Sequence, residues 1–138
     1  AQTIEGLFFP GYGQADANPD IGDSAITETG GIGGFCMGNA PAIVGFVGGS
    51  AADALQFTHL MYEITLAENP AWTLPALNFR GAPTGIDIRR VLETSILPII
   101  NTGIAHREAG IGMIGAGLVR PPLDCFTQAV LQLAQNRG

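Results

Sequence analysis

Residues 80–85, Arg-Gly-Ala-Pro-Thr-Gly, combine residue types that could hold a small anion. The guanidinium of Arg80 offers a flat fork of donors that matches carboxylates and phosphates. Thr84 can donate a hydroxyl hydrogen bond, and Gly81 and Gly85 let the backbone approach a ligand closely. We therefore predict Arg80, Gly81, Thr84 and Gly85 as substrate-binding residues, with Arg120 as a second cation of the same pocket. The alternative is a tight loop in which Arg80 pairs with a nearby acid.

Asn101, Thr102 and His106 form a second group of polar residues, which follows another apolar segment. An amide, a hydroxyl and an imidazole can orient a small amide or acyl group, so we predict these three as catalytic residues. Ligands in open α/β sheets bind beyond the carboxyl ends of strands, and this loop is therefore expected to lie beside residues 80–85. The alternative for His106 is a structural role.

Acidic residues cluster between positions 16 and 28. Asp20, Asp23 and Glu28 are candidate ligands for Mg²⁺ or Ca²⁺, which prefer oxygen atoms, although their spacing does not match an EF-hand. They could equally position a cationic or amide group. The alternative is a solvated acidic loop in which Asp23 caps the next helix. We predict no cofactor, and no metal site beyond these three candidates.

The glycine-rich run at residues 30–34, Gly-Gly-Ile-Gly-Gly, predicts a close approach of backbone. It does not match a dinucleotide-binding fingerprint, because no strand precedes it and the spacing of the third glycine differs. The run indicates a helix start against which a ligand or another chain lies, with close helix packing as the alternative.

Composition excludes several function classes. Of the 138 residues, 46% are hydrophobic and 13% are charged, and the net charge is −6. All six basic residues are Arg, which excludes a P-loop lysine and Schiff-base chemistry, and the absence of a basic stripe argues against nucleic acid as a partner. The apolar stretches are too short to span a membrane. The low charge predicts that another part of the protein, or a partner subunit, covers some of the surface.

The two cysteines, Cys36 and Cys125, are far apart in the sequence and flanked by apolar residues. They lack metal-ligand spacing, so we expect two buried free thiols. Reduced thiols and the absence of a visible signal peptide predict a cytoplasmic protein.

Hydrophobic periodicity and turn signals predict that strands and helices alternate along the chain. Ser50 is expected to cap one helix, with Asp53 completing a capping box. The alternation predicts an α/β fold, a mixed sheet covered by helices, in which residues 1–138 form a single domain or a fragment of one. The early first strand favours a piece of a larger protein. Strands are expected at residues 4–9, 74–79, 97–101 and 111–119, the last being either a strand or a glycine-rich turn, and helices at residues 41–47, 51–66, 87–94 and 123–135.

Several longer runs resemble the C-terminal half of the AllG-like (YlbE-like) family. They are DANPDIGDSAITE at residues 16–28, PTGID at 83–87, INTGIA at 100–105 and GAGLVRPP at 115–122. The similarity covers nearly the whole chain, and members of the family are much longer, so the resemblance implies a C-terminal part only. The family offers no agreed catalytic residues. The Ser-Thr-Arg-Thr phosphate loop of the aspartate and ornithine carbamoyltransferases is absent from this sequence.

The resemblance implies a subunit of an oxamate carbamoyltransferase built from three different subunits. Such an enzyme moves a carbamoyl group between oxalurate and phosphate in the breakdown of allantoin, a source of purine nitrogen. The expected ligands are oxamate, oxalurate, phosphate and carbamoyl phosphate, and the expected partners are other protein subunits.

For that reaction we predict that Arg80 and Arg120 hold the carboxylate and the phosphate. Backbone N–H groups near residues 81–85 would stabilise the oxyanion, while Asn101, Thr102 and His106 orient the carbamoyl amide.

Two other functions remain open. One is a non-catalytic scaffold subunit, favoured by the low charge. The other is a metal-dependent hydrolase that uses Asp20, Asp23 and Glu28.

Overall fold

The computed structural model describes residues 2–136 and confirms the α/β class, with helices and strands interleaved along the chain. In chain order the elements are β1 (Glu5–Phe8), η1 (Gln14–Asp16), α1 (Asp23–Thr29), η2 (Gly33–Asn39), α2 (Pro41–Phe46), α3 (Ala51–Glu63), β2 (Thr65–Leu74), η3 (Pro75–Leu77), β3 (Arg80–Ile86), α4 (Ile88–Thr94), β4 (Ile100–Ala105), β5 (Met113–Val119) and α5 (Leu123–Gln135).

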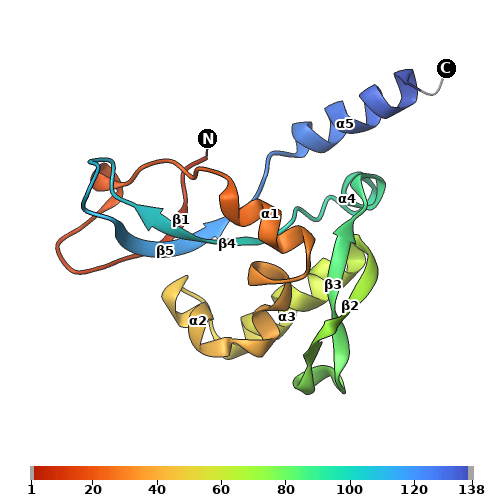
Figure 1. The fold of residues 1–138 in the computed structure, drawn as a ribbon, viewed down its shortest axis with the longest axis horizontal. Coiled ribbons are helices and arrows are strands. Elements are labelled where there is room, and N and C mark those ends of the chain that lie inside the picture. The colour runs from red at the N-terminus through yellow and green to blue at the C-terminus, as the bar shows by residue number, and fades with distance from the viewer. Residues whose placement is uncertain (1, 137–138) are drawn as a thin grey trace.

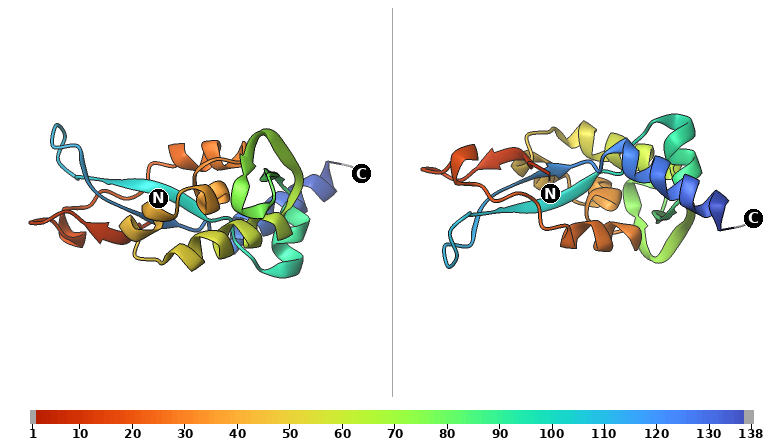
Figure 2. Two further views of the ribbon diagram at one scale, coloured as in Figure 1. Left: turned by 90° about the horizontal axis from the view of Figure 1, so that it is seen from below. Right: turned by 90° about the horizontal axis from the view of Figure 1, so that it is seen from above.

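The described strands pair antiparallel in two separate sheets. One sheet has the order β1-β5-β4, and the other is the hairpin of β2 and β3. The views in Figure 2 show α1 on one side of the three-stranded sheet and α2 and α3 on the other, while Figure 1 shows the hairpin beside α3 and α5 projecting from the rest. Within the three-stranded sheet β4 is paired only with β5. Its second edge contacts the chain before α1 at one end, where the carbonyl of Ala105 accepts from the N–H of Asn18 at 2.8 Å, so the free edge is the part at residues 101–103.

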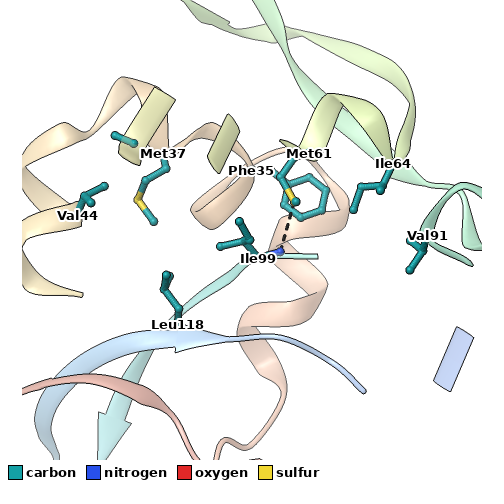
Figure 3. Close-up of a cluster of buried hydrophobic side chains, with 9 residues drawn as sticks. Phe35, Met37, Val44, Met61, Ile64, Val91, Ile99 and Leu118 are labelled. Atoms are coloured by element: carbon teal, nitrogen blue, oxygen red, sulfur yellow. Dashed lines mark hydrogen bonds between the residues drawn. The ribbon is translucent and has the colours of Figure 1, made fainter. Parts of the chain in front are cut away.

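The main core lies between the three-stranded sheet, η2, α2 and α3 (Figure 3). Phe35, Met37 and Met61 are buried there, and Leu118 of β5 reaches the cluster from the sheet. The backbone N–H of Ile99 lies 3.3 Å from the sulfur of Met61, as the dashed line in Figure 3 marks. A smaller cluster around Ile104 and Ile114 has Ala25 of α1 packed against it. The two clusters hold helices to the sheet.

The glycine-rich run at residues 30–34 packs closely against the backbone before β4 and within β3, whereas the alternative interpretation expected close packing of helices. A Cβ on Gly34 would lie 2.1 Å from the carbonyl oxygen of Ile99, just before β4. A Cβ on Gly31 would lie 2.9 Å from the carbonyl oxygen of Pro83 in β3. The run therefore lets this segment contact the backbone just before β4 and in the middle of β3.

Several element predictions are confirmed. Strand β1 lies within residues 4–9, and residues 111–119 contain strand β5 rather than a glycine-rich turn. Helices α2, α4 and α5 match their predicted ranges to within a residue at each end. Ser50 caps α3, because its hydroxyl accepts from the N–H of Asp53 at 3.3 Å while the Asp53 carboxylate accepts from the N–H of Ser50 at 2.6 Å.

The prediction of a strand at residues 74–79 and a loop at residues 80–85 is wrong. Helix α3 ends at Glu63 rather than at residue 66, and residues 65–74 form β2. The turn of the hairpin follows, with Asn78 and Phe79 at positive φ, and residues 80–86 form β3. The Asn69-Pro70 pair favours a helix end by its local preference, but it lies within β2. Asn69 pairs with Ala82, and Pro70 falls in the irregularity of the register between Asn69 and Thr73, where a strand tolerates proline.

Strand β4 begins three residues later than predicted and continues to Ala105. Asn101 lies in a strand as predicted, whereas Thr102 lies in the strand rather than in the loop expected after residue 101. Both cysteines are free, but Cys36 is only half-buried and Cys125 is exposed on α5, so the prediction of two buried thiols is wrong. Within residues 2–136, no helix combines the length and apolar character needed to cross a bilayer.

Substitution of Gly34 by Ala tests the close packing of η2 against the start of β4. The added Cβ would overlap the Ile99 carbonyl, so we expect the free energy of unfolding to fall by about 1–3 kcal/mol, as for other overpacked sites. Gly45→Ala is the matched control, because nothing lies within 4 Å of its Cβ position and Ala favours a helix. Urea denaturation measures both variants, and equal stability of Gly34→Ala and the wild type would contradict the packing.

Candidate functional site

The carboxyl group of Glu28 is buried at the point where α1, η2 and β4 meet. Glu28 is only 1% exposed. Its Oε1 accepts hydrogen bonds from the backbone N–H of Gly34 and of Asn101, both at 2.9 Å. Its Oε2 accepts from the hydroxyl of Thr27 at 2.9 Å. One side chain thus joins α1, η2 and β4, and Asn101 of β4 lies 73 positions from Glu28 in the sequence.

Burial raises the pKa of Glu28 above its ordinary value, although the hydrogen bonds from Gly34, Asn101 and Thr27 favour the charged form. No ion pair of Glu28 is found among the described residues. Gly33 is also required here, because a Cβ at that position would lie 2.2 Å from Oε1 of Glu28. The geometry around the carboxyl group therefore depends on the glycine-rich run.

A chain of three side chains links α1 to β4 next to this carboxyl group. The hydroxyl of Ser24 donates to Oγ1 of Thr102 at 3.1 Å, and the hydroxyl of Thr102 donates to Oδ1 of Asp20 at 3.0 Å. Oδ2 of Asp20 accepts from the backbone N–H of Gly22 at 3.0 Å. Thr102 is 6% exposed, and its hydroxyl is therefore held in a fixed position between its two partners.

An open groove follows the free edge of β4 between α1 and α2. It consists of two adjoining pockets of about 320 and 360 Å³. Both pockets are lined by Ser24, Thr102, Gly103 and Met113. The first extends to the acidic residues Asp20 and Asp23, and the second to the α2 side chains Ile43 and Phe46 together with Asn101 of β4.

The backbone of Gly103 also faces this groove. In an antiparallel pair, successive residues turn their N–H and C=O groups alternately toward and away from the neighbouring strand. The N–H of Asn101 points away from β5, because it donates to Glu28. Gly103, two residues on, has the same orientation and offers one donor and one acceptor at the free edge. The groove therefore contains the backbone N–H and C=O of Gly103, which have no strand partner, together with hydroxyl and carboxylate oxygens.

The segment predicted to cradle an anion is engaged in other contacts. The Nε of Arg80 lies 2.6 Å from Oε1 of Glu68, and its guanidinium carbon lies 3.6 Å from the centre of the Tyr62 ring. The carbonyl of Gly81 accepts from the Tyr62 hydroxyl at 2.6 Å, and the hydroxyl of Thr84 donates to the carbonyl of Thr29 at 2.7 Å. This arrangement is the alternative interpretation, in which Arg80 pairs with a nearby acid.

Arg80 and Arg120 do not line a common pocket. Arg80 begins β3 of the hairpin, whereas Arg120 follows β5 of the other sheet and is exposed beside Gln2 and Glu5. Gly85 has a φ of 74° and is the next-to-last residue of β3. No Arg or His within residues 2–136 lines either pocket of the groove. The structure therefore does not bring the predicted cations to Asn101 and Thr102.

His106 lies outside the groove. Its Nδ1 accepts from the backbone N–H of Glu108 at 2.9 Å, and its ring packs edge-on against Tyr12. The candidate metal ligands also fail to come together, since the Glu28 oxygens accept from Gly34, Asn101 and Thr27. Across the described part of the chain, no group of three or more His, Cys, Asp or Glu side chains is arranged to hold a metal ion.

Ser24 and Gly103 are groove residues that the sequence did not single out. Ser24 contacts Thr102 across 78 positions of sequence, a pairing that no local pattern indicates. Gly103 contributes through its backbone, so its residue type carries no chemical signal. Both lie within the runs that resemble the AllG-like family, and that resemblance was the available indication.

Comparison with known proteins shows close similarity over the whole chain. The chain is 56% identical over 138 residues to "Uncharacterized protein YahG" of Escherichia coli strain K12. That alignment covers 100% of this chain and 29% of the relative. The chain is 56% identical over 137 residues to "Oxamate carbamoyltransferase subunit AllG" of the same organism, covering 99% of this chain and 33% of the relative. No family model matches the chain.

A solved structure has the same fold. It is the crystal structure of a conserved protein of unknown function from Enterococcus faecalis V583, with a TM-score of 0.93 and 58% identity. The match covers 98% of this chain and 32% of that one. The chain thus spans about a third of the length of the relatives that it matches, which is consistent with the expected C-terminal part.

Glu28→Gln tests the burial of this carboxyl group. The raised pKa means that the folded state holds the proton more tightly than the unfolded state. The stability that this group contributes is therefore full below its ordinary pKa and declines as the pH rises through the raised value. Gln cannot ionise and keeps an oxygen for the two N–H groups, so we expect Glu28→Gln to gain stability relative to the wild type as the pH rises from about 4 to about 8.

Glu28→Ala is the companion variant. It leaves the N–H groups of Gly34 and Asn101 without their acceptor and opens a cavity, so we expect a loss of about 2–4 kcal/mol at every pH. Denaturant unfolding over a pH series measures both variants. Parallel pH profiles of Glu28→Gln and the wild type would contradict the account.

Proposed function

This chain is related to the AllG-like (YlbE-like) proteins over its whole length, and from that premise we propose that it forms part of a carbamoyltransferase subunit acting on oxamate or oxalurate and carbamoyl phosphate. The observation that carries the proposal is the 56% identity to a protein named as an oxamate carbamoyltransferase subunit. The pathway expected from the resemblance is the breakdown of allantoin.

In the proposed reaction a phosphate oxygen bonds to the carbamoyl carbon of oxalurate. The bond from that carbon to the oxamate nitrogen breaks, and the proton of the phosphate passes to the nitrogen. The products are oxamate and carbamoyl phosphate, and the reverse reaction uses the same groups. Catalysis would come mainly from holding the two reactants in line.

We assign the amide end of the substrate to the groove along β4. Two of the three predicted catalytic residues, Asn101 and Thr102, line this groove, and His106 is not carried forward. The described residues of the groove include acidic groups and no basic side chain. The cations that bind the carboxylate and the phosphate would therefore come from the rest of an AllG-like protein or from a partner subunit.

Thr102→Val in the assembled enzyme tests this assignment. The substitution keeps the shape of the side chain and removes the hydroxyl between Ser24 and Asp20, so we expect kcat/KM for oxalurate to fall about 10-fold or more. Formation of carbamoyl phosphate from oxalurate and phosphate is the readout. Thr29→Val is the matched control, because its hydroxyl is exposed and donates only to the Ile26 carbonyl within α1.

If Thr102→Val has unchanged kinetics, the groove is not part of the substrate-binding site. Absence of carbamoyl phosphate formation with any set of partner subunits, for the wild type as well, would contradict the proposed reaction itself.

Helix α5 favours a second role, assembly with the remainder of an AllG-like protein. None of its residues is buried, and Leu131 and Leu133 are 51% and 42% exposed at its projecting end (Figure 1). Only Phe126 of the helix packs against the main core. Relatives are about three times as long as this chain, so a large polypeptide is at hand to cover the apolar face.

Leu131→Asp tests this assembly role. We expect the charge to weaken binding of this chain to the unmatched portion of AllG by at least about 10-fold, with little loss of stability, because Leu131 is 51% exposed in the chain alone. Gln132→Asp, about 100° around the helix axis from Leu131 and further from the apolar face, is the control. Titration by fluorescence anisotropy measures both variants. Equal binding by the two would exclude the α5 face, and light scattering would reveal self-association instead.

A further inference from the structure

The direction of the hydrogen bonds between α1 and β4 determines what Ser24 can bind. A carboxylate oxygen only accepts, so the hydroxyl of Thr102 must donate to Asp20. Having used its single proton, Thr102 can only accept from Ser24, so the hydroxyl of Ser24 must donate in turn. The Ser24 oxygen is then left with lone pairs and no proton for a ligand. It is an acceptor at the surface of the groove.

The surroundings of Ser24 strengthen this preference for hydrogen-bond donors. Asp20 and Asp23 line the same pocket, and the described lining contains no basic side chain to offset their charge. A ligand carboxylate would bring one of its oxygens against the Ser24 oxygen, which has no proton to donate, and near the two aspartates. A ligand –NH₂ group would instead place hydrogen atoms against the Ser24 oxygen.

The edge of β4 supplies the complementary partner for the other half of an amide. The outward N–H of Gly103 can donate to an amide carbonyl, and its outward C=O can accept from an amide nitrogen. Gly103 lines both pockets with Ser24, so one small planar group can reach both. On the side where a Cβ at position 103 would project, the sulfur of Met113 lies 3.0 Å from the Cβ position, so Met113 covers that face and Gly103 is reached from the edge of the strand.

We propose that Ser24 and the free edge of β4 at Gly103 form a binding site for a primary amide, in which Ser24 accepts from the –NH₂ group and the Gly103 N–H donates to the amide carbonyl. The site distinguishes a carboxamide from the carboxylate of the same shape. The identity of the natural ligand rests on the proposed carbamoyltransferase function: with oxamate, the nitrogen that exchanges the carbamoyl group lies against Ser24. Thr102 and Asp20 act as positioning residues that orient the Ser24 hydroxyl.

The first test uses ligands that do not depend on the proposed function. Acetamide and acetate have the same shape and differ in –NH₂ against –O⁻. We expect acetamide, titrated into the ¹⁵N-labelled chain, to shift the backbone amide signals of Gly103 and its neighbours, and acetate to leave them unchanged. Shifts of equal size with both ligands, or with neither, would overturn the amide site.

The second test uses oxamate and oxalate, a pair matched in the same way, with affinity measured by calorimetry. Ser24→Ala should weaken oxamate binding about 3- to 10-fold, the effect of one neutral hydrogen bond, and leave oxalate binding unchanged. Ser24→Thr keeps the hydroxyl and should bind oxamate within about 2-fold of the wild type. Equal losses for oxamate and oxalate, or no loss, would overturn the role of Ser24.

The two tests separate the two claims. Acetamide shifts without measurable binding of oxamate would support the amide site and contradict oxamate as its ligand. Oxamate binding without a shift of the Gly103 amide signal would support oxamate as a ligand of the chain. It would contradict the assignment of the amide site to Gly103.

Discussion

The structure around the groove depends on one buried carboxyl group. Glu28 accepts from the backbone of η2 and of β4 while its own backbone belongs to α1, so its position sets how far α1 lies from the free edge of the sheet. Gly33 and Gly34 make that position available, because a side chain at either residue would overlap Glu28 or the chain just before β4. The contact of Ser24 with Thr102, one turn away along α1, follows from this spacing.

The sequence predicted a site that binds anions, whereas the groove set by this geometry favours ligands that donate hydrogen bonds. An anion site requires cations or free N–H groups, and Arg80 and Arg120 lie in different pockets of the chain. Arg80 is held by Glu68 and by the ring of Tyr62. What the groove offers is mostly hydrogen-bond acceptors, which suit the nitrogen end of oxamate. Under the proposed function, a substrate with an amide at one end and a carboxylate at the other would be shared between this chain and the rest of an AllG-like protein or a partner subunit.

The sequence predicted those features that local chemistry determines. The capping box at Ser50, the amphipathic helix α5 and the resemblance to the AllG-like family are confirmed, as is the α/β class. The β2–β3 hairpin was missed because Asn69-Pro70 and Pro75 indicate a break locally, whereas pairing between strands decides the outcome. The sequence predicted Glu28 as a candidate metal ligand, but its partners are the backbone N–H groups of residues 34 and 101. No sequence pattern indicates such partners, because backbone groups are the same at every residue type except proline.

A crystal structure of the chain with oxamate bound would test the central claim most directly. The account predicts that oxamate lies along the free edge of β4, with its nitrogen within hydrogen-bonding distance of Ser24 Oγ and its amide oxygen near the N–H of Gly103. Oxamate bound instead beside Arg80 or Arg120, with the groove along β4 empty, would contradict it.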